Sequence, residues 1–147
     1  MMNFKHILTA FCLLLAGGIF QPAAADNLPV VPRPLNMSVG EGSFLFKPTT
    51  TFGVENAAQL KMVSAFAGRF GASAGFVPAV SIGNKSADVT FVTDSSLSSE
   101  AYSLKVTADG ITVKATDNSG FFYALQTLRQ LLPAAIDGKT ATDEPMK

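Results

Sequence analysis

Residues 101–133 read AYSLKVTADGITVKATDNSGFFYALQTLRQLLP, and this stretch decides the fold. Apolar side chains first recur at every second position, which is the pattern of two half-buried strands, at Tyr102, Leu104, Val106, Ile111, Val113 and Ala115. Asp109-Gly110 between the two runs is a pair favoured in hairpin turns. The spacing then changes to four, three and four, which is one stripe of a helix, at Phe121, Leu125, Leu128 and Leu132. The stretch therefore predicts two joined strands and an amphipathic helix that covers a sheet.

The preceding residues predict further strands and one more helix. The proline-rich run 27–34 is extended because each proline ring fixes φ. Residues 56–70 have helical spacing, with Asn56 as N-cap and Gly71 as the left-handed residue that ends the helix. Alternating or β-branched runs predict strands at 35–39, 43–47, 50–54 and 88–93, and residues 71–84 are a loop with at most one strand, at 76–80.

Length and charge limit the class of protein. The 147 residues are enough for one modest domain, and a hydrophobic content of 48% is ample for a packed core. Eleven basic and eleven acidic residues cancel. The overall charge therefore gives no reason to expect a nucleic acid, an anionic membrane surface or a polyanionic substrate as partner.

The first 25 residues have the features of a secretory signal peptide. Lys5 and His6 precede an apolar run at 7–20, and Ala23-Ala24-Ala25 supplies the small residues of a cleavage site. A membrane anchor is the alternative, but the run is shorter than the roughly 20 residues that span a bilayer. We expect cleavage after Ala25, no membrane span in the mature chain, and export to the periplasm or the extracellular space.

Cleavage would remove Cys12 and His6, which are the only cysteine and the only histidine. The mature chain would then lack the commonest general base, the commonest metal ligand and the thiolate nucleophile. Catalysis by this chain would then have to rest on carboxylates, hydroxyls or lysines. Because the sequence also contains no calcium-binding loop and no phosphate-binding loop, we expect no metal and no cofactor in this chain. The adjacent carboxylates Asp143-Glu144 lie in a small, polar tail at 134–147, which is typical of a solvated linker.

One set of polar side chains lies off the apolar stripe of the second predicted helix. It comprises Tyr123, Gln126, Arg129 and Gln130. The simpler interpretation is an exposed polar face. The alternative is a domain interface, in which the planar guanidinium of Arg129 pairs with a carboxylate or with backbone carbonyls of a neighbour.

Several runs resemble the N-terminal domain of glycoside hydrolase family 20 β-N-acetylhexosaminidases. The most specific is Gly120–Leu132, GFFYALQTLRQLL. It follows Tyr102–Val106 and Gly110–Ala115, and further upstream the Pro-rich Val31–Pro34 precedes Gly40-Glu41-Gly42 and a Phe-rich segment. The resemblance covers residues 28–133, which is almost the whole mature chain.

The resemblance implies a fold and a neighbour. It implies an α+β domain, an antiparallel-rich sheet with two helices on one face, placed before a catalytic (β/α)8 barrel. In that family an adjacent Asp-Glu pair of the barrel, in a His-x-Gly-Gly-Asp-Glu context, works with the substrate's own N-acetyl group. Asp143-Glu144 follows Ala141-Thr142, so that motif does not carry over.

These observations combine into one prediction with one rival. The chain is a signal peptide (1–25), a family 20 N-terminal α+β domain (26–133) and a linker (134–147) toward a catalytic barrel. Its function is to support a secreted β-N-acetylhexosaminidase that removes terminal N-acetylhexosamine from glycans, while this domain performs no chemistry. The alternative is a free-standing exported carbohydrate-binding or interaction module.

Overall fold

The computed structural model describes residues 28, 30–40, 42–140 and 145–147. The predicted signal peptide and the Asp143-Glu144 pair lie outside the described residues. The elements within the described part, in chain order, are β1 (Thr51–Val54), α1 (Ala57–Ala74), β2 (Ala79–Ile82), β3 (Val89–Thr93), β4 (Tyr102–Val106), β5 (Ile111–Ala115), α2 (Asn118–Leu131) and the 3-10 helix η2 (Ala134–Asp137).

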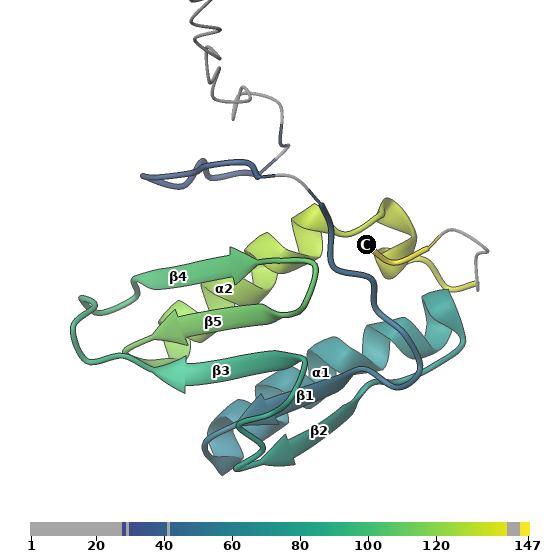
Figure 1. The fold of residues 1–147 in the computed structure, drawn as a ribbon, viewed down its shortest axis with the longest axis horizontal. Coiled ribbons are helices and arrows are strands. Elements are labelled where there is room, and N and C mark those ends of the chain that lie inside the picture. The colour runs from purple at the N-terminus through teal and green to yellow at the C-terminus, as the bar shows by residue number, and fades with distance from the viewer. Residues whose placement is uncertain (1–27, 29, 41, 141–144) are drawn as a thin grey trace, which may run out of the picture.

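The strands form one mixed sheet in the order β2-β1-β3-β5-β4 (Figure 1). The pairs β1–β2, β1–β3 and β3–β5 are parallel, and only the pair β4–β5 is antiparallel. The prediction of an antiparallel-rich sheet is therefore wrong. A strand, a returning helix and a second strand in one sheet place the two strands parallel, and β1, α1 and β2 are such a unit.

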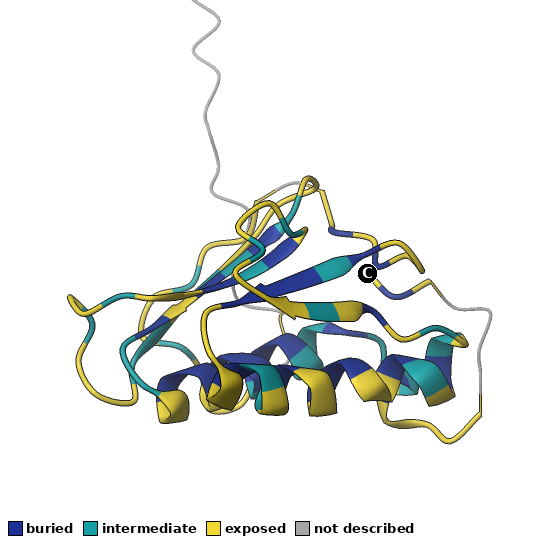
Figure 2. Cartoon of the chain, turned by 90° about the horizontal axis from the view of Figure 1, so that it is seen from below, coloured by how far each residue is buried: buried dark blue, intermediate teal, exposed yellow. Residues whose placement is uncertain are grey.

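Both helices lie on one face of the sheet, as predicted (Figure 2). Helix α1 contacts β1 and β2, whereas α2 contacts β4 and β5, so each helix covers one half of the sheet. The buried faces of the helices point toward the sheet, and Figure 2 shows exposed residues on the side facing away from it. The architecture is two layers, with an uncovered helix surface on the outside.

A line of phenylalanine rings joins the helices to the sheet. Phe70 of α1 lies 4.9 Å from Phe46, between ring centroids, and Phe66 lies 6.3 Å from Phe52 of β1. Phe91 of β3 then lies 6.1 Å from Phe121 of α2. Each of these rings is at most 7% exposed. Because a buried aromatic side chain contributes about 1.5–3 kcal/mol, this line is the centre of the core.

The connection between β2 and β3 runs back across the open face of the sheet. Gly83 donates its N–H to the carbonyl of Val54, and the carboxylate of Asp88 accepts from the Thr51 N–H at 2.8 Å. A methyl group on Gly53 would collide with the Asn84 carbonyl oxygen. Only glycine leaves room for the crossing chain here.

The helix ends agree in part with the sequence. Asn56 is the N-cap of α1, as predicted, and accepts from the Gln59 N–H at 2.9 Å. The helix does not end at Gly71 but at Gly75, which has the left-handed φ of 76°. A Cβ at Gly71 would lie 3.0 Å from Val77, so this glycine serves close packing rather than a turn.

Two segments differ from the predicted strands and linker. Residues 35–39 and 43–47 form no regular strand in the described structure, although Phe44 and Phe46 are buried. After Pro133 the chain is packed, since Ile136 and Met146 are each 2% exposed and the Met146 carbonyl accepts from the Phe46 N–H. The start and the end of the domain therefore meet beside the core.

Candidate functional site

Arg129 of α2 binds a carboxylate of its own chain. Its Nε lies 2.7 and 3.0 Å from the two carboxylate oxygens of Asp137, which ends η2. Arg69 of α1 reaches the same carboxylate at 3.0 Å. The hydrogen bond from Arg129 lowers the pKa of Asp137, and the charges of both arginines act in the same direction. Asp137 therefore fastens the segment after Pro133 to both helices.

Gln130 binds the proline-rich segment. Its side-chain oxygen accepts from the Val31 N–H at 2.8 Å, and its side-chain N–H donates to the Val31 carbonyl at 3.0 Å. This two-way contact imitates the pairing of two strands and fixes the lead-in segment to the last turn of α2. Gln130 thus has a partner 99 residues earlier in its own chain.

The two remaining predicted interface residues, Gln126 and Tyr123, differ in how far they are exposed. Gln126 is half-buried and accepts from the Arg129 guanidinium at 3.5 Å, which is a weak contact. Tyr123 is 45% exposed, and the neighbouring Phe122, which the sequence analysis did not select, is 49% exposed. Their rings are 5.8 Å apart at 67°. Of the four predicted residues, the structure brings Gln126 and Arg129 together and leaves Tyr123 on the surface.

The carboxylates at the carboxyl ends of the strands have structural partners. Asp117 is the N-cap of α2, and its carboxylate accepts from the Gly120 N–H, the Ser99 hydroxyl and the Glu100 N–H. These contacts, the Gly120 N–H first, lower the pKa of Asp117. The Thr93 side chain contributes most to lowering the pKa of Glu55, and the Thr93 N–H, bonded to the same carboxylate at 2.8 Å, acts in the same direction. Both acids are kept ionised, which suits a cap rather than a proton donor.

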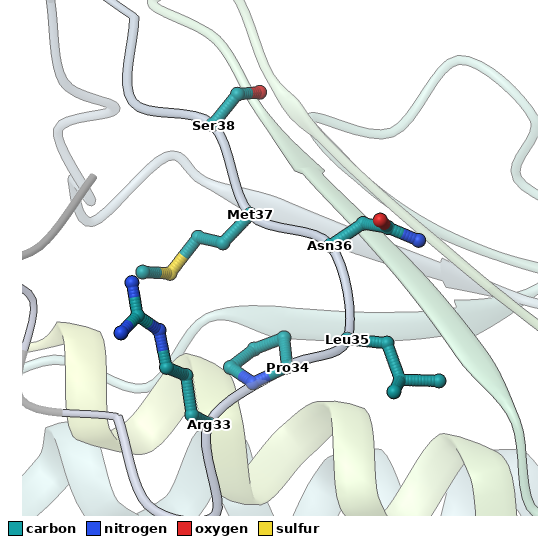
Figure 3. Close-up of a pocket in the computed structure, with 6 residues that line it drawn as sticks. All are labelled: Arg33, Pro34, Leu35, Asn36, Met37 and Ser38. Carbon is teal, nitrogen blue, oxygen red and sulfur yellow. The ribbon is translucent and has the colours of Figure 1, made fainter. Parts of the chain in front are cut away.

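Two cavities border the N-terminal segment. One, of about 690 Å³, is lined by the consecutive residues 33–38 (Figure 3). Figure 3 shows Arg33 and Met37 pointing to one side of this loop and Leu35 to the other. The second, of about 810 Å³, lies between the same segment, β4 and the last turn of α2. Neither lining combines the nucleophile, base and oxyanion donors that a reaction centre requires.

No group of three or more metal-binding side chains occurs among the described residues. Within that same part of the chain, no helix has the length and hydropathy needed to cross a membrane.

The described residues form a two-layer α+β domain, and comparison with known proteins identifies its family. Residues 27–144 match the family described as glycosyl hydrolase family 20, domain 2. The chain belongs to this family. It is 29% identical over 147 residues to a β-hexosaminidase of Porphyromonas gingivalis and 33% identical over 129 residues to a β-hexosaminidase of Vibrio vulnificus. These alignments cover 92% and 84% of this chain but only 19% and 14% of those enzymes.

Solved structures of family 20 enzymes also match this chain over a small part of their length. A Streptomyces plicatus N-acetyl-β-hexosaminidase is 25% identical, with a TM-score of 0.72 over 86% of this chain and 25% of that enzyme. A Vibrio harveyi family 20 exo-β-N-acetylglucosaminidase is 26% identical, with a TM-score of 0.63 over 72% of this chain and 16% of that enzyme. The resemblance inferred from the sequence is thereby confirmed. In each case the chain corresponds to a small part of a much longer enzyme.

Proposed function

We propose that this chain is the non-catalytic support domain of an exported β-N-acetylhexosaminidase. The observation that carries the proposal is the family match over residues 27–144, in a chain that spans less than a fifth of its curated relatives. The reaction, release of terminal N-acetylhexosamine from glycans, belongs on this proposal to a (β/α)8 barrel in the remainder of the parent protein. The domain's role is to offer that barrel a rigid surface.

The outer surface of the helix layer is suited to being covered. Helices α1 and α2, of 18 and 14 residues, contain no Asp or Glu and only three basic residues. Solvent-facing helix surfaces usually carry many charges of both signs. We call this face the outer helix surface; its exposed residues are Ala57, Ala58, Lys61, Ser64, Ala65, Gly68, Arg69 and Ala72 on α1 and Asn118, Ser119, Phe122 and Tyr123 on α2.

The residues of this surface favour close contact with a protein. Small side chains on α1 let another backbone approach, and aromatic side chains such as Phe122 and Tyr123 are enriched in interfaces. Asp137 pairs with both Arg69 and Arg129 and so offsets one of their two positive charges. Burying this surface therefore desolvates fewer charges than burying a helix face with many charges of both signs. Of the predicted interface residues, we assign Tyr123 to contact with the barrel, whereas Arg129 and Gln130 hold the domain's own flanks.

The docking surface is tested in the full-length parent. Ala65→Glu and Tyr123→Glu place a charge on the outer helix surface, and Ser103→Glu places one at an exposed position of β4 as a control. We expect the first two to lower the melting temperature and the activity of the parent, while all three change the isolated domain by no more than about 0.5 kcal/mol. A parent that tolerates Ala65→Glu and Tyr123→Glu as well as Ser103→Glu would refute this docking surface.

The proposal that this chain performs no catalysis is tested separately. The purified 147-residue chain is assayed on a chromogenic N-acetylglucosaminide, and we expect no turnover above the buffer blank. Turnover would overturn the non-catalytic role. The reading frame beyond Lys147 is also informative, because continuation into His-x-Gly-Gly-Asp-Glu supports the parent enzyme, whereas a stop codon favours a free-standing module.

A carbohydrate-binding module is the alternative, and the exposed Phe122–Tyr123 pair is the observation that favours it. The two rings are inclined at 67°, however, and so form no flat platform for a sugar ring. Titration with N-acetylglucosamine oligosaccharides separates the two functions, since only the module would bind them through this pair.

Export of the chain is also a proposal. It is tested by locating the processed chain and sequencing its N-terminus, for which we expect Asp26.

A further inference from the structure

Two arginines share a single carboxylate at one end of the outer helix surface. Nη1 of Arg69 and Nε of Arg129 lie 3.0 and 2.7 Å from the same oxygen of Asp137. The three side chains are 36–41% exposed. Asp137 is ionised, because the hydrogen bond from Arg129 lowers its pKa. One negative charge therefore faces two positive charges, and this arginine cluster, Arg69, Arg129 and Asp137, keeps a net positive charge.

The arginine cluster joins both helices of the outer helix surface. Helix α1 follows β1 and α2 follows β5, and both strands are parallel to β3. The helices therefore end on the same side of the sheet, beside η2 (Figure 1). On α2, Phe122, Gln126 and Arg129 are four and three residues apart, so they lie on one stripe. Phe122 is 49% exposed. A domain that covers this stripe reaches the cluster as well.

Both guanidinium groups have donors that Asp137 does not use. Each group carries five N–H donors in one plane. Arg69 uses Nη1 for Asp137, and Arg129 uses Nε for Asp137 and, weakly at 3.5 Å, Nη1 for Gln126. Within the part of the chain that the structure describes, neither Nη2 group has an acceptor. Two adjacent side chains can thus donate to one more acceptor.

Covering the cluster requires a negative charge from the covering surface. A charge that leaves water loses its hydration, and an unpaired buried charge is strongly unfavourable. A backbone carbonyl could accept the hydrogen bonds, but it would leave the net positive charge in place.

We propose that the catalytic barrel of the parent places an Asp or Glu carboxylate on the Nη2 groups of Arg69 and Arg129. The contact rests on the proposed function, since it needs the barrel. Two guanidinium groups are then balanced by two carboxylates, and charge-assisted hydrogen bonds of this kind are the strong ones.

The charge of the two helices favours the same partner. Lys61, Arg69 and Arg129 are their only charged residues, although the whole chain has equal numbers of acidic and basic residues. Complementary charges across an interface fix its orientation more than they add affinity. Phe122 supplies apolar contact area, whereas the arginine cluster fixes how the barrel is turned on the helices.

Zero-length cross-linking of the full-length parent tests the contact. A carbodiimide joins an amine to a carboxylate only where the two are in contact, and guanidinium groups do not react. Arg69→Lys supplies the amine at an exposed position. After digestion and mass spectrometry, we expect position 69 to be joined to an Asp or Glu beyond Lys147. The wild-type parent should give no cross-link at position 69, and the exposed Lys105 of β4 should give none to the barrel.

A charge exchange tests what the contact does. Arg69→Glu should lower the temperature at which the parent loses half of its activity, and it should shift the melting temperature of the isolated chain less. Replacing the cross-linked carboxylate by arginine in the Arg69→Glu parent should restore most of this loss.

Three outcomes would overturn the carboxylate contact. A cross-link to Asp137 alone, in a parent that Tyr123→Glu weakens, would keep the docking surface and remove the carboxylate. Equal effects of Arg69→Glu on the parent and on the isolated chain would mean that Arg69 stabilises only its own domain. A stop codon after Lys147 would remove the barrel, and the proposed function would then fail together with the contact.

Discussion

Gly120 fixes how closely α2 approaches the hairpin, and Gly120→Ala tests this contact. A methyl group on Gly120 would lie 2.5 Å from the Ala101 carbonyl oxygen and 2.8 Å from the Ala115 Cβ. Both distances are shorter than van der Waals contact, and the neighbouring atoms belong to backbone or to a Cβ that cannot rotate away. The start of α2 must therefore move outward, away from β5.

The expected magnitude comes from two opposed effects. Alanine raises helix propensity relative to glycine by up to about 1 kcal/mol. Overpacking in a well-packed site costs about 1–3 kcal/mol. Because the Gly120 N–H is also bonded to the Asp117 carboxylate at 2.8 Å, the shift stretches the N-cap as well. We expect a net loss of about 1–2 kcal/mol in the free energy of unfolding.

Gly68→Ala is the matched control in α1. Gly68 is exposed, and a methyl group there would have no heavy atom within 4 Å. Only the propensity effect remains, so we expect a gain of about 0.5–1 kcal/mol. Thermal and urea unfolding of both variants at one pH measures the difference, with about 4–8 °C per kcal/mol for a domain of this size. A Gly120→Ala variant at least as stable as Gly68→Ala would refute the close approach.

Three further changes have defined outcomes. Leu125→Asp puts a charge at a position only 3% exposed and should unfold the chain, as seen by far-UV circular dichroism; a folded variant with an unchanged melting temperature would contradict the packing of α2. For Asp117 the folded pKa is lowered, so its contribution is present above the ordinary value of 3.8 and is lost as the pH falls through the folded pKa. The stability gap between wild type and Asp117→Asn, from urea unfolding, should therefore shrink below about pH 4, and a constant gap would refute the cap's electrostatic role. Gln130→Ala removes both bonds to Val31 and should cost about 1 kcal/mol and accelerate exchange of the Val31 amide; unchanged exchange would show that the contact does not hold the segment.

Periodicity located the helices and the hairpin, but it could not give the direction of strand pairing. Val89–Thr93, Tyr102–Val106 and Ile111–Ala115 are strands close to where their apolar spacing predicts them. Alternation reports that a strand has a buried face, but not which strand lies beside it. The order strand, helix, strand implies the parallel arrangement of β1 and β2, whereas the antiparallel-rich sheet was implied only by the resemblance to the family.

For the predicted interface residues, helix spacing likewise predicted which side chains are exposed but not which residues they contact. Amphipathic spacing placed Tyr123 and Arg129 off the buried stripe, and both are at least partly exposed. It could not show that Asp137, eight residues later, would turn back to Arg129, because that depends on the short helix η2 after Pro133. Phe122 was not selected because the sequence analysis chose polar side chains off the apolar stripe, and nothing in the local pattern marks a phenylalanine as exposed.

Adjacent residues of α2 hold the two flanks of the domain. Gln130 binds the incoming chain at Val31, and Arg129 binds the outgoing chain at Asp137. Consecutive helix positions lie about 100° apart, so one turn can serve two segments on different sides. The alternative interpretation of the sequence placed both side chains at a domain interface; in this structure both bind segments of their own chain. The docking surface that we propose needs a fixed position relative to the chain that leads out of the domain. The Asp137 contact supplies this, because it holds the outgoing chain against α1 and against α2, which carries Phe122 and Tyr123.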